Sequence, residues 1–137
     1  MMIYKVFRYI SFLVNSRNQH SVHSPIVYKL LTECIYRLDK KLLKRDQSSL
    51  KKSISKIYQN EFEVHYFNNT LSINSSEFAV KKDRIVIVSD LRNKNQYYFW
   101  KKLIIDNKIH VSIDFYYFGI IIIRNKKLQK QDYQIRL

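Results

Sequence analysis

Glycine, proline and cysteine are almost missing from this chain, since each occurs once among 137 residues. A loop that cradles phosphate or a dinucleotide needs several glycines close together, so a single glycine excludes a site of that kind. The one cysteine, Cys34, excludes a disulfide framework and a zinc site built from several cysteines. With 46% hydrophobic and 26% charged residues, the composition is nevertheless that of a folded protein.

Acidic residues are also scarce, with 11 against 25 Lys and Arg, which gives a formal net charge of +14. Such an excess fits an anionic partner, either nucleic acid or an acidic membrane face. The alternative is compositional bias, because Lys far outnumbers Arg, the better residue for recognising phosphate. We expect the densest basic stretch to form a solvated surface. It consists of Lys40, Lys41, Lys44, Arg45, Lys51, Lys52 and Lys56.

The first 15 residues carry apolar side chains at helical spacing, with Lys5 and Arg8 near the opposite side. The apolar positions are Ile3, Val6, Phe7, Ile10, Leu13 and Val14. We expect a helix docked on the rest of the domain; the alternative is a helix lying in the plane of a membrane. The segment is too short to span a bilayer, and its charges argue against a signal peptide. We therefore expect a cytoplasmic protein without a transmembrane segment.

Ser24 and Pro25 mark the start of a second helix, because Ser caps free amides and Pro is tolerated at the first helical position. An apolar stripe follows at Ile26, Val27, Leu30, Leu31, Cys34, Ile35 and Leu38. The position of Cys34 on this stripe predicts a buried, inert thiol. A further helical pattern extends to Ile57, and residues 47–49 are expected to interrupt it.

Two strands are expected in the middle of the chain. Polar and apolar residues alternate from Glu61 to Phe67, which predicts a half-buried strand. Residues 85–88 are all apolar and β-branched, as in a strand that is covered on both faces. Between these two strands we expect irregular structure that includes a short strand at 71–73.

The closing part of the chain is expected to hold a helix at 95–106, strands at 109–116 and 120–124, and an edge strand at 132–137. The helix should bury Tyr98, Phe99 and Leu103. Gly119 is expected to supply the special backbone angle of the turn between the two longer strands. A strand, a helix and another strand in this order argue for an α/β sheet.

These elements predict one α/β domain over residues 1–137, with a mixed sheet, N-terminal helices and a C-terminal antiparallel hairpin. Residues 1–60 form its mostly helical part, and residues 61–137 form the α/β part.

Few side chains suggest a site by their pattern. Asp114 lies within a strand pattern and needs a partner if it is buried; Arg124 on the neighbouring strand is the candidate, and a structural ion pair is the favoured interpretation. His20 and His23 have the spacing of two zinc ligands but no third ligand nearby, so a hydrogen bond at the helix entry is the favoured role. No metal site is expected.

Two stretches carry a family resemblance. The first, residues 18–36, contains His-Ser-Pro-Ile-Val-Tyr (23–28) followed by Leu30-Leu31. The second, residues 84–137, contains Ile-Val-Ile-Val-Ser-Asp (85–90), Phe-Trp-Lys-Lys-Leu (99–103) and Val-Ser-Ile-Asp-Phe-Tyr-Tyr-Phe-Gly-Ile (111–120). Together these stretches resemble a bacterial family of class I S-adenosylmethionine (SAM)-dependent methyltransferase-like proteins. The resemblance implies a truncated Rossmann-like sheet, with 85–89 as the fifth strand, 95–106 as the next helix and 109–124 as the terminal hairpin.

The segment that binds SAM in the resembled family has no counterpart here. Family members carry an acidic, Gly-rich turn after the first strand, whereas this chain has no glycine between Tyr36 and Arg84. At the end of the fifth strand the family commonly has two acids, and this chain has Ser89 and Asp90. Ser89 and Asp90 are therefore the remaining candidates for cofactor binding, and Asp90 is the candidate for catalysis.

The resemblance thus implies a degenerate, shortened methyltransferase-like protein without catalytic activity or a bound cofactor. One alternative is an active SAM-dependent methyltransferase with an atypical site or one completed by a partner. Another is a basic module that binds nucleic acid or an anionic surface. A shortened sheet would leave an open edge and an uncovered apolar face, so we expect a homo-oligomer or a partner protein there.

Overall fold

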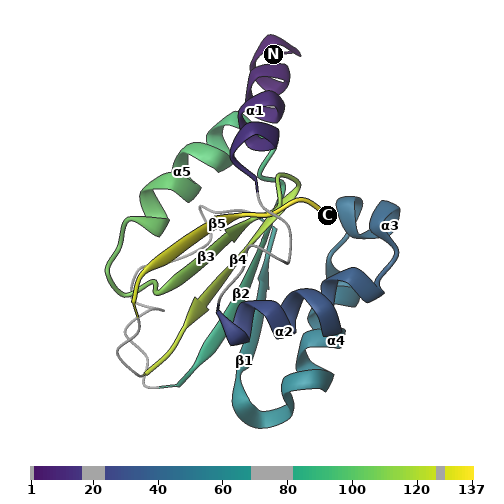
Figure 1. The fold of residues 1–137 in the computed structure, drawn as a ribbon, viewed down its shortest axis with the longest axis vertical. Helices are drawn as coiled ribbons and strands as arrows, with labels where there is room; N and C mark the ends of the chain where they lie inside the picture. Colours follow the sequence, from purple (N-terminus) through teal and green to yellow (C-terminus); the bar gives the residue numbers. More distant parts are fainter. Residues whose placement is uncertain (1, 17–23, 69–81, 126–128) are drawn as a thin grey trace.

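The computed structural model of the protein describes residues 2–16, 24–68, 82–125 and 129–137 (Figure 1). The helices are α1 (Met2–Asn15), α2 (Pro25–Glu33), η2 (Ile35–Arg37), α3 (Lys40–Arg45), α4 (Ser48–Tyr58), η3 (Gln59–Glu61) and α5 (Lys94–Ile104). The strands are β1 (Glu63–Phe67), β2 (Arg84–Ser89), β3 (Val111–Asp114), β4 (Phe118–Ile123) and β5 (Gln131–Gln134). The strand expected at 71–73 lies outside the described residues, as do His20 and His23.

The strands form one five-stranded mixed sheet in the order β1-β2-β4-β3-β5, which confirms the expected α/β class with a mixed sheet. β1 is parallel to β2, and β4 runs antiparallel to both β2 and β3. β5 adds to the far edge, parallel to β3, and so has the expected role of an edge strand. The hairpin strand β4 therefore lies between β2 and β3, which α5 connects along the chain.

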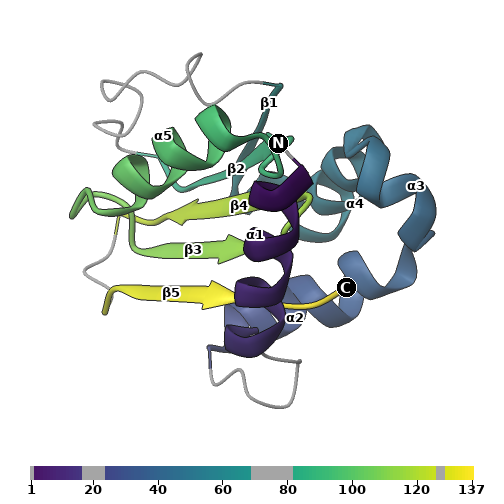
Figure 2. The same ribbon diagram turned by 90° about the horizontal axis from the view of Figure 1, so that it is seen from above.

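Helices cover both faces of the sheet (Figures 1 and 2). Ile85 and Ile87 of β2 face the core under α2, α3 and α4, whereas Val86 and Val88 face the core under α5. Alternation along a strand sends successive side chains to opposite faces. The uninterrupted apolar run at 85–88 is thus explained by burial on both sides, as expected from its composition.

The helices α2, α3 and α4 form as their sequence predicts. The Ser24 hydroxyl accepts a hydrogen bond from the Val27 N–H at 3.5 Å, and Pro25 opens α2. The apolar stripe of α2 is buried through Cys34. The break between α3 and α4 falls at Asp46 and Gln47, so it includes only the first of the residues expected at 47–49, and Ser48 opens α4. Most of the basic residues between Lys40 and Lys56 are exposed, which confirms a solvated surface.

Helix α1 forms as expected, but it packs on its other face. It crosses the carboxyl ends of β3 and β5 (Figure 2). Among the side chains of residues 3–15, Arg8 and Phe12 are buried, whereas the apolar stripe from Ile3 to Val14 is exposed. The helix is docked on the domain as expected, but not through its apolar stripe. The physical reason is that Arg8 pairs with the buried carboxylate of Asp114, and this pair fixes the rotation of α1 about its own axis.

The turn of the β3–β4 hairpin lies two residues earlier than expected, and the glycine has another role. The turn is at 115–117, where Tyr116 has a positive φ of 74°, and Gly119 has no positive φ. A Cβ atom at residue 119 would lie 2.5 Å from Cη2 of Trp100 and 2.8 Å from Cδ1 of Leu91. The expectation that Gly119 makes the turn is thus wrong, because the residue is needed for close packing inside β4.

Helix α5 buries Trp100 against the sheet, and Leu103 packs on the same core, so the expected buried side is confirmed in part. Tyr98 is exposed, and Phe99 and Leu103 are not fully buried. Trp100 is the most deeply buried residue of α5, because the missing side chain at Gly119 leaves a space that the indole fills. Among the described residues no helix is long and apolar enough to cross a membrane.

Candidate functional site

The carboxyl end of β2 carries the two residues expected to bind a cofactor. The Ser89 hydroxyl donates a hydrogen bond to the Asn68 carbonyl at 3.2 Å and so joins the ends of β1 and β2. Asp90 is exposed and has a positive φ of 59°, as expected of a residue that turns the chain toward α5. Within the part of the chain that the structure describes, its carboxylate has no ion pair. The two side chains thus have no common partner.

A buried ion pair joins α1 to the end of β3. Nη2 of Arg8 lies 3.1 Å from both carboxylate oxygens of Asp114, and the two residues are only 6% and 3% exposed. The Tyr116 N–H also donates to Asp114, at 2.8 Å. The guanidinium of Arg8 stacks over the Tyr97 ring, 3.6 Å from its centroid. A buried charge needs such compensation, and here a cation, an N–H group and an aromatic face supply it.

The structural ion pair expected at Asp114 is confirmed, but its expected partner is wrong. Asp114 is opposite Gly119 in the hairpin, whereas Arg124 follows the opposite end of β4. An offset of five residues along a strand is about 16 Å, too far for contact. Arg124 binds Asp83 at 3.3 Å and Glu61 at 3.2 Å, and so links the end of β4 to the start of β2 and to η3.

The surroundings of the ion pair alter the ionisation of two groups. Burial raises the pKa of Asp114 above its ordinary value, although the charge of Arg8 acts in the opposite direction. Burial also raises the pKa of Tyr97, and the negative charge of Asp114 adds to this effect. Asp114 is held by hydrogen bonds from Arg8 and from the Tyr116 N–H, and it also lines a cavity beside the sheet.

Two adjoining cavities lie beside the ion pair. A cleft of about 590 Å³ separates α1 from α5 and is lined by aromatic side chains together with Arg8, Lys94 and Lys101. A smaller cavity of about 350 Å³ reaches the sheet, where the Ser112 hydroxyl donates to Asp132 at 2.6 Å. Neither lining includes a histidine or a cysteine. The cleft with its three cations can hold an apolar or anionic group, whereas the smaller cavity pairs a hydroxyl with a carboxylate but has no histidine among the described residues of its lining to relay a proton between them.

The remaining candidate residues lie in separate places. His65 is near Glu63 in β1, and the Nδ1 of His110 accepts a hydrogen bond from the Arg124 N–H at 3.2 Å. Cys34 is buried, as expected, and burial raises the pKa of its thiol. The described ranges contain no group of three His, Cys, Asp or Glu residues that could hold a metal ion. The histidine pair at 20 and 23 is outside those ranges.

Arg8 is the central residue of this site that the sequence did not single out. The available signal was a lone arginine on the side of a helix opposite an apolar stripe, together with a lone acid in a buried strand. Nothing in the spacing of the two residues, 106 positions apart, connects them. Comparison of the chain with protein-family models, with curated proteins and with solved structures finds no match.

Proposed function

We propose that this chain is a methyltransferase-like protein that neither binds SAM nor transfers a methyl group. The observation that carries the proposal is the use of its single glycine. Gly119 packs inside β4 against Trp100 and Leu91, so the chain has no glycine left for a cofactor loop. A cofactor with adenosyl and amino-acid parts needs close backbone approach, which glycines permit.

The order of the elements supports the methyltransferase-like part of the proposal. β2 is followed by α5 and then by the β3–β4 hairpin, as the resemblance implies for a fifth strand, its helix and a terminal hairpin. The parallel pair β1–β2 and the antiparallel β4 form a sheet that ends in a hairpin.

The polar residues at the end of β2 support the loss of activity. The Ser89 hydroxyl is used in a hydrogen bond to the Asn68 carbonyl, and Asp90 is a turn residue with an exposed carboxylate. One carboxylate is too little to hold a Mg²⁺-type ion, which takes several oxygen ligands. Asp90 alone therefore provides neither a cofactor cradle nor a metal centre.

Calorimetric titration of the full chain with SAM tests the proposal. We expect no saturable heat at SAM concentrations up to about 1 mM, which corresponds to a binding free energy weaker than about −4 kcal/mol. The variant Asp90→Asn serves as the matched control. Micromolar binding that Asp90→Asn abolishes would overturn the proposal and establish an atypical SAM site at the end of β2.

A further inference from the structure

The apolar stripe of α1 is exposed, although Phe7 at its edge also lines the cleft between α1 and α5. Ile3 is 73% exposed, Phe7 is 68% exposed and Val14 is 76% exposed. The stripe consists of six exposed apolar side chains: Ile3, Val6, Phe7, Ile10, Leu13 and Val14. Figure 1 shows α1 projecting beyond the sheet and the other helices. A continuous apolar face in this position marks an interaction surface.

The opposite side of α1 holds the helix in this orientation. Arg8 forms the buried ion pair with Asp114, and Phe12 packs on the ring of Tyr116 with centroids 5.6 Å apart. Tyr116 also donates a hydrogen bond to the Lys5 carbonyl at 3.4 Å. Ile10 follows Arg8 by two residues, which is about 200° around an α-helix. The helix cannot turn its apolar stripe inward without leaving a buried carboxylate unpaired.

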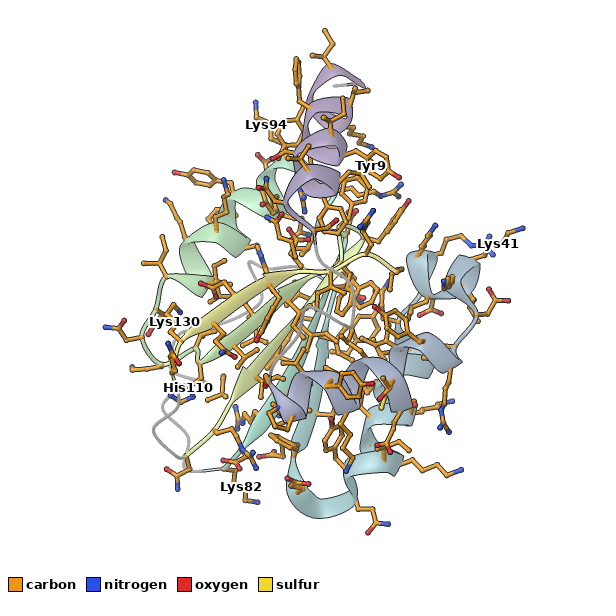
Figure 3. The ribbon with its side chains drawn as sticks, in the orientation of Figure 1. Tyr9, Lys41, Lys82, Lys94, His110 and Lys130 are labelled. Atoms are coloured by element: carbon orange, nitrogen blue, oxygen red, sulfur yellow. The ribbon has the colours of Figure 1, made fainter. Side chains whose placement is uncertain are left out.

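The surroundings of the stripe are basic and aromatic. Residues 1–32 contain no Asp or Glu, and the chain as a whole has a net charge of +14. The ammonium group of Lys94 lies 5.7 Å from the ring centroid of Tyr4, beside α1. Figure 3 shows the labelled Lys94 on one side of α1 and the exposed Tyr9 of α1 on the other. Asp114, the acid that contacts this helix, is already neutralised by Arg8.

We propose that α1 is a docking surface for an anionic lipid bilayer. The helix lies in the plane of the membrane, with its apolar stripe at the boundary of headgroups and acyl chains. Lys94 contacts the lipid phosphates, and the exposed Tyr9 lies at the level of the headgroups. A helix of 14 residues is about 21 Å long, enough to lie on a bilayer but too short to cross one.

Charge selects the bilayer over the other occupants of an apolar face. A second copy of this chain would bring two basic surfaces together, with no acid in α1 to compensate them. Nucleic acid would satisfy the lysines but leave the apolar stripe in water. A bilayer that contains anionic lipid covers the stripe and neutralises the lysines at once. This inference is independent of whether SAM binds.

Co-sedimentation with lipid vesicles tests the proposal on the full chain. The probes are vesicles of neutral phosphatidylcholine, and the same vesicles with about a third of phosphatidylglycerol. We expect binding to the anionic vesicles that is at least about tenfold stronger than binding to neutral ones, and that weakens as salt rises. Equal binding to both kinds of vesicle, or binding to neither, would overturn the proposal.

Two substitutions separate the apolar stripe from the overall charge. Ile3→Asp places an acid in the stripe, whereas Ile105→Asp makes the same change at the end of α5; both isoleucines are 73% exposed. An Asp in the first turn of α1 also favours the helix, so the fold should be kept, as circular dichroism will verify. We expect Ile3→Asp to reduce vesicle binding at least about tenfold and Ile105→Asp to reduce it less than about twofold.

Three other results contradict the proposal. The first is equal loss of vesicle binding in the two variants, which would mean that only charge matters. The second is a wild-type dimer that Ile3→Asp converts to a monomer, without vesicle binding, which would assign the stripe to self-association. The third is tight binding of duplex DNA or RNA by both variants without vesicle binding, which would assign the basic charge to nucleic acid.

Discussion

Gly119 occupies a position in β4 where a side chain has no room. A Cβ atom there would approach the Trp100 ring at 2.5 Å and 2.7 Å, closer than carbon atoms pack in proteins. Trp100 is itself buried and cannot move outward without opening the core under α5. The packing of this single residue therefore connects β4, α5 and the turn at Leu91.

Replacing this glycine tests the packing directly. We expect Gly119→Ala to lower the free energy of unfolding by about 1 to 3 kcal/mol, because overpacking forces Trp100 and Leu91 to shift. Urea unfolding followed by circular dichroism measures the change. Trp100→Phe in the Gly119→Ala background is the control, since Phe lacks the outer ring atoms. The packing argument is wrong if Trp100→Phe costs as much in that background as it does in the wild type.

Asp114 is the other residue on which much of the structure depends. Its carboxylate accepts hydrogen bonds from Arg8 of α1 and from the Tyr116 N–H of the hairpin turn. Removing one charge of a buried ion pair lowers the free energy of unfolding more than removing both charges, because the remaining charge stays buried without a partner.

Among the elements, α1 depends most on this pair, since Arg8 and Phe12 are the buried side chains among its residues 3–15. We expect Asp114→Asn to release α1 from the sheet, because an unpaired buried guanidinium costs about 3 to 5 kcal/mol. Limited digestion with trypsin should then cleave at Lys5 and Arg8 faster than in the wild type. Asp132→Asn, the same change on the neighbouring strand β5, is the control. Equal cleavage in the two variants would mean that the pair does not hold α1.

The elements differ in how well their sequence predicts them. The start of α2 at Ser24 and Pro25 and the buried run at 85–88 were correct, because local capping and β-branched composition act within a few residues. The side of α1 that is buried is not its apolar stripe, and the buried side of α5 agrees with its pattern only in part, since Leu103 packs on the core but Tyr98 is exposed. A helical pattern gives the apolar side of a helix, but the partner decides which side is buried, and here the partners are Asp114 and Gly119.

The whole molecule has a five-stranded sheet whose two faces are covered by different helices. The core under α2, α3 and α4 holds Cys34 and Tyr58. The thiol of Cys34 and the hydroxyl of Tyr58 are neutral when protonated and become negative when they lose the proton. Burial raises the pKa of the Cys34 thiol and of the Tyr58 hydroxyl, which donates a hydrogen bond to the Ile26 carbonyl at 3.2 Å.

These raised pKa values predict a loss of stability at alkaline pH. Above about pH 8.5 for Cys and about pH 10 for Tyr, the unfolded chain releases protons that the folded protein retains. The unfolded state then binds fewer protons, so the free energy of unfolding falls as pH rises. Urea unfolding at about pH 7.5 and about pH 10.5 should show a loss of at least about 1 kcal/mol.

The variant Tyr58→Phe identifies one source of this pH dependence. It should cost about 1 kcal/mol at neutral pH, because the hydrogen bond to the Ile26 carbonyl is lost. It should also make the decline above about pH 10 shallower, since one ionisable group is removed from the core. An unchanged slope would show that the buried hydroxyl of Tyr58 has no part in the alkaline effect.

The sequence alone determined the α/β class, the start of α2, the doubly covered strand β2, the burial of Cys34 and the absence of glycines for a cofactor loop. Composition, capping and short periodic patterns decide these features, and none of the three depends on which distant residues come into contact. Only the tertiary structure decided that Arg8 meets Asp114, that Gly119 makes room for Trp100 and that the apolar stripe of α1 faces outward. Such features depend on contacts between residues far apart in the chain, and a pattern within one segment carries no information about its partner.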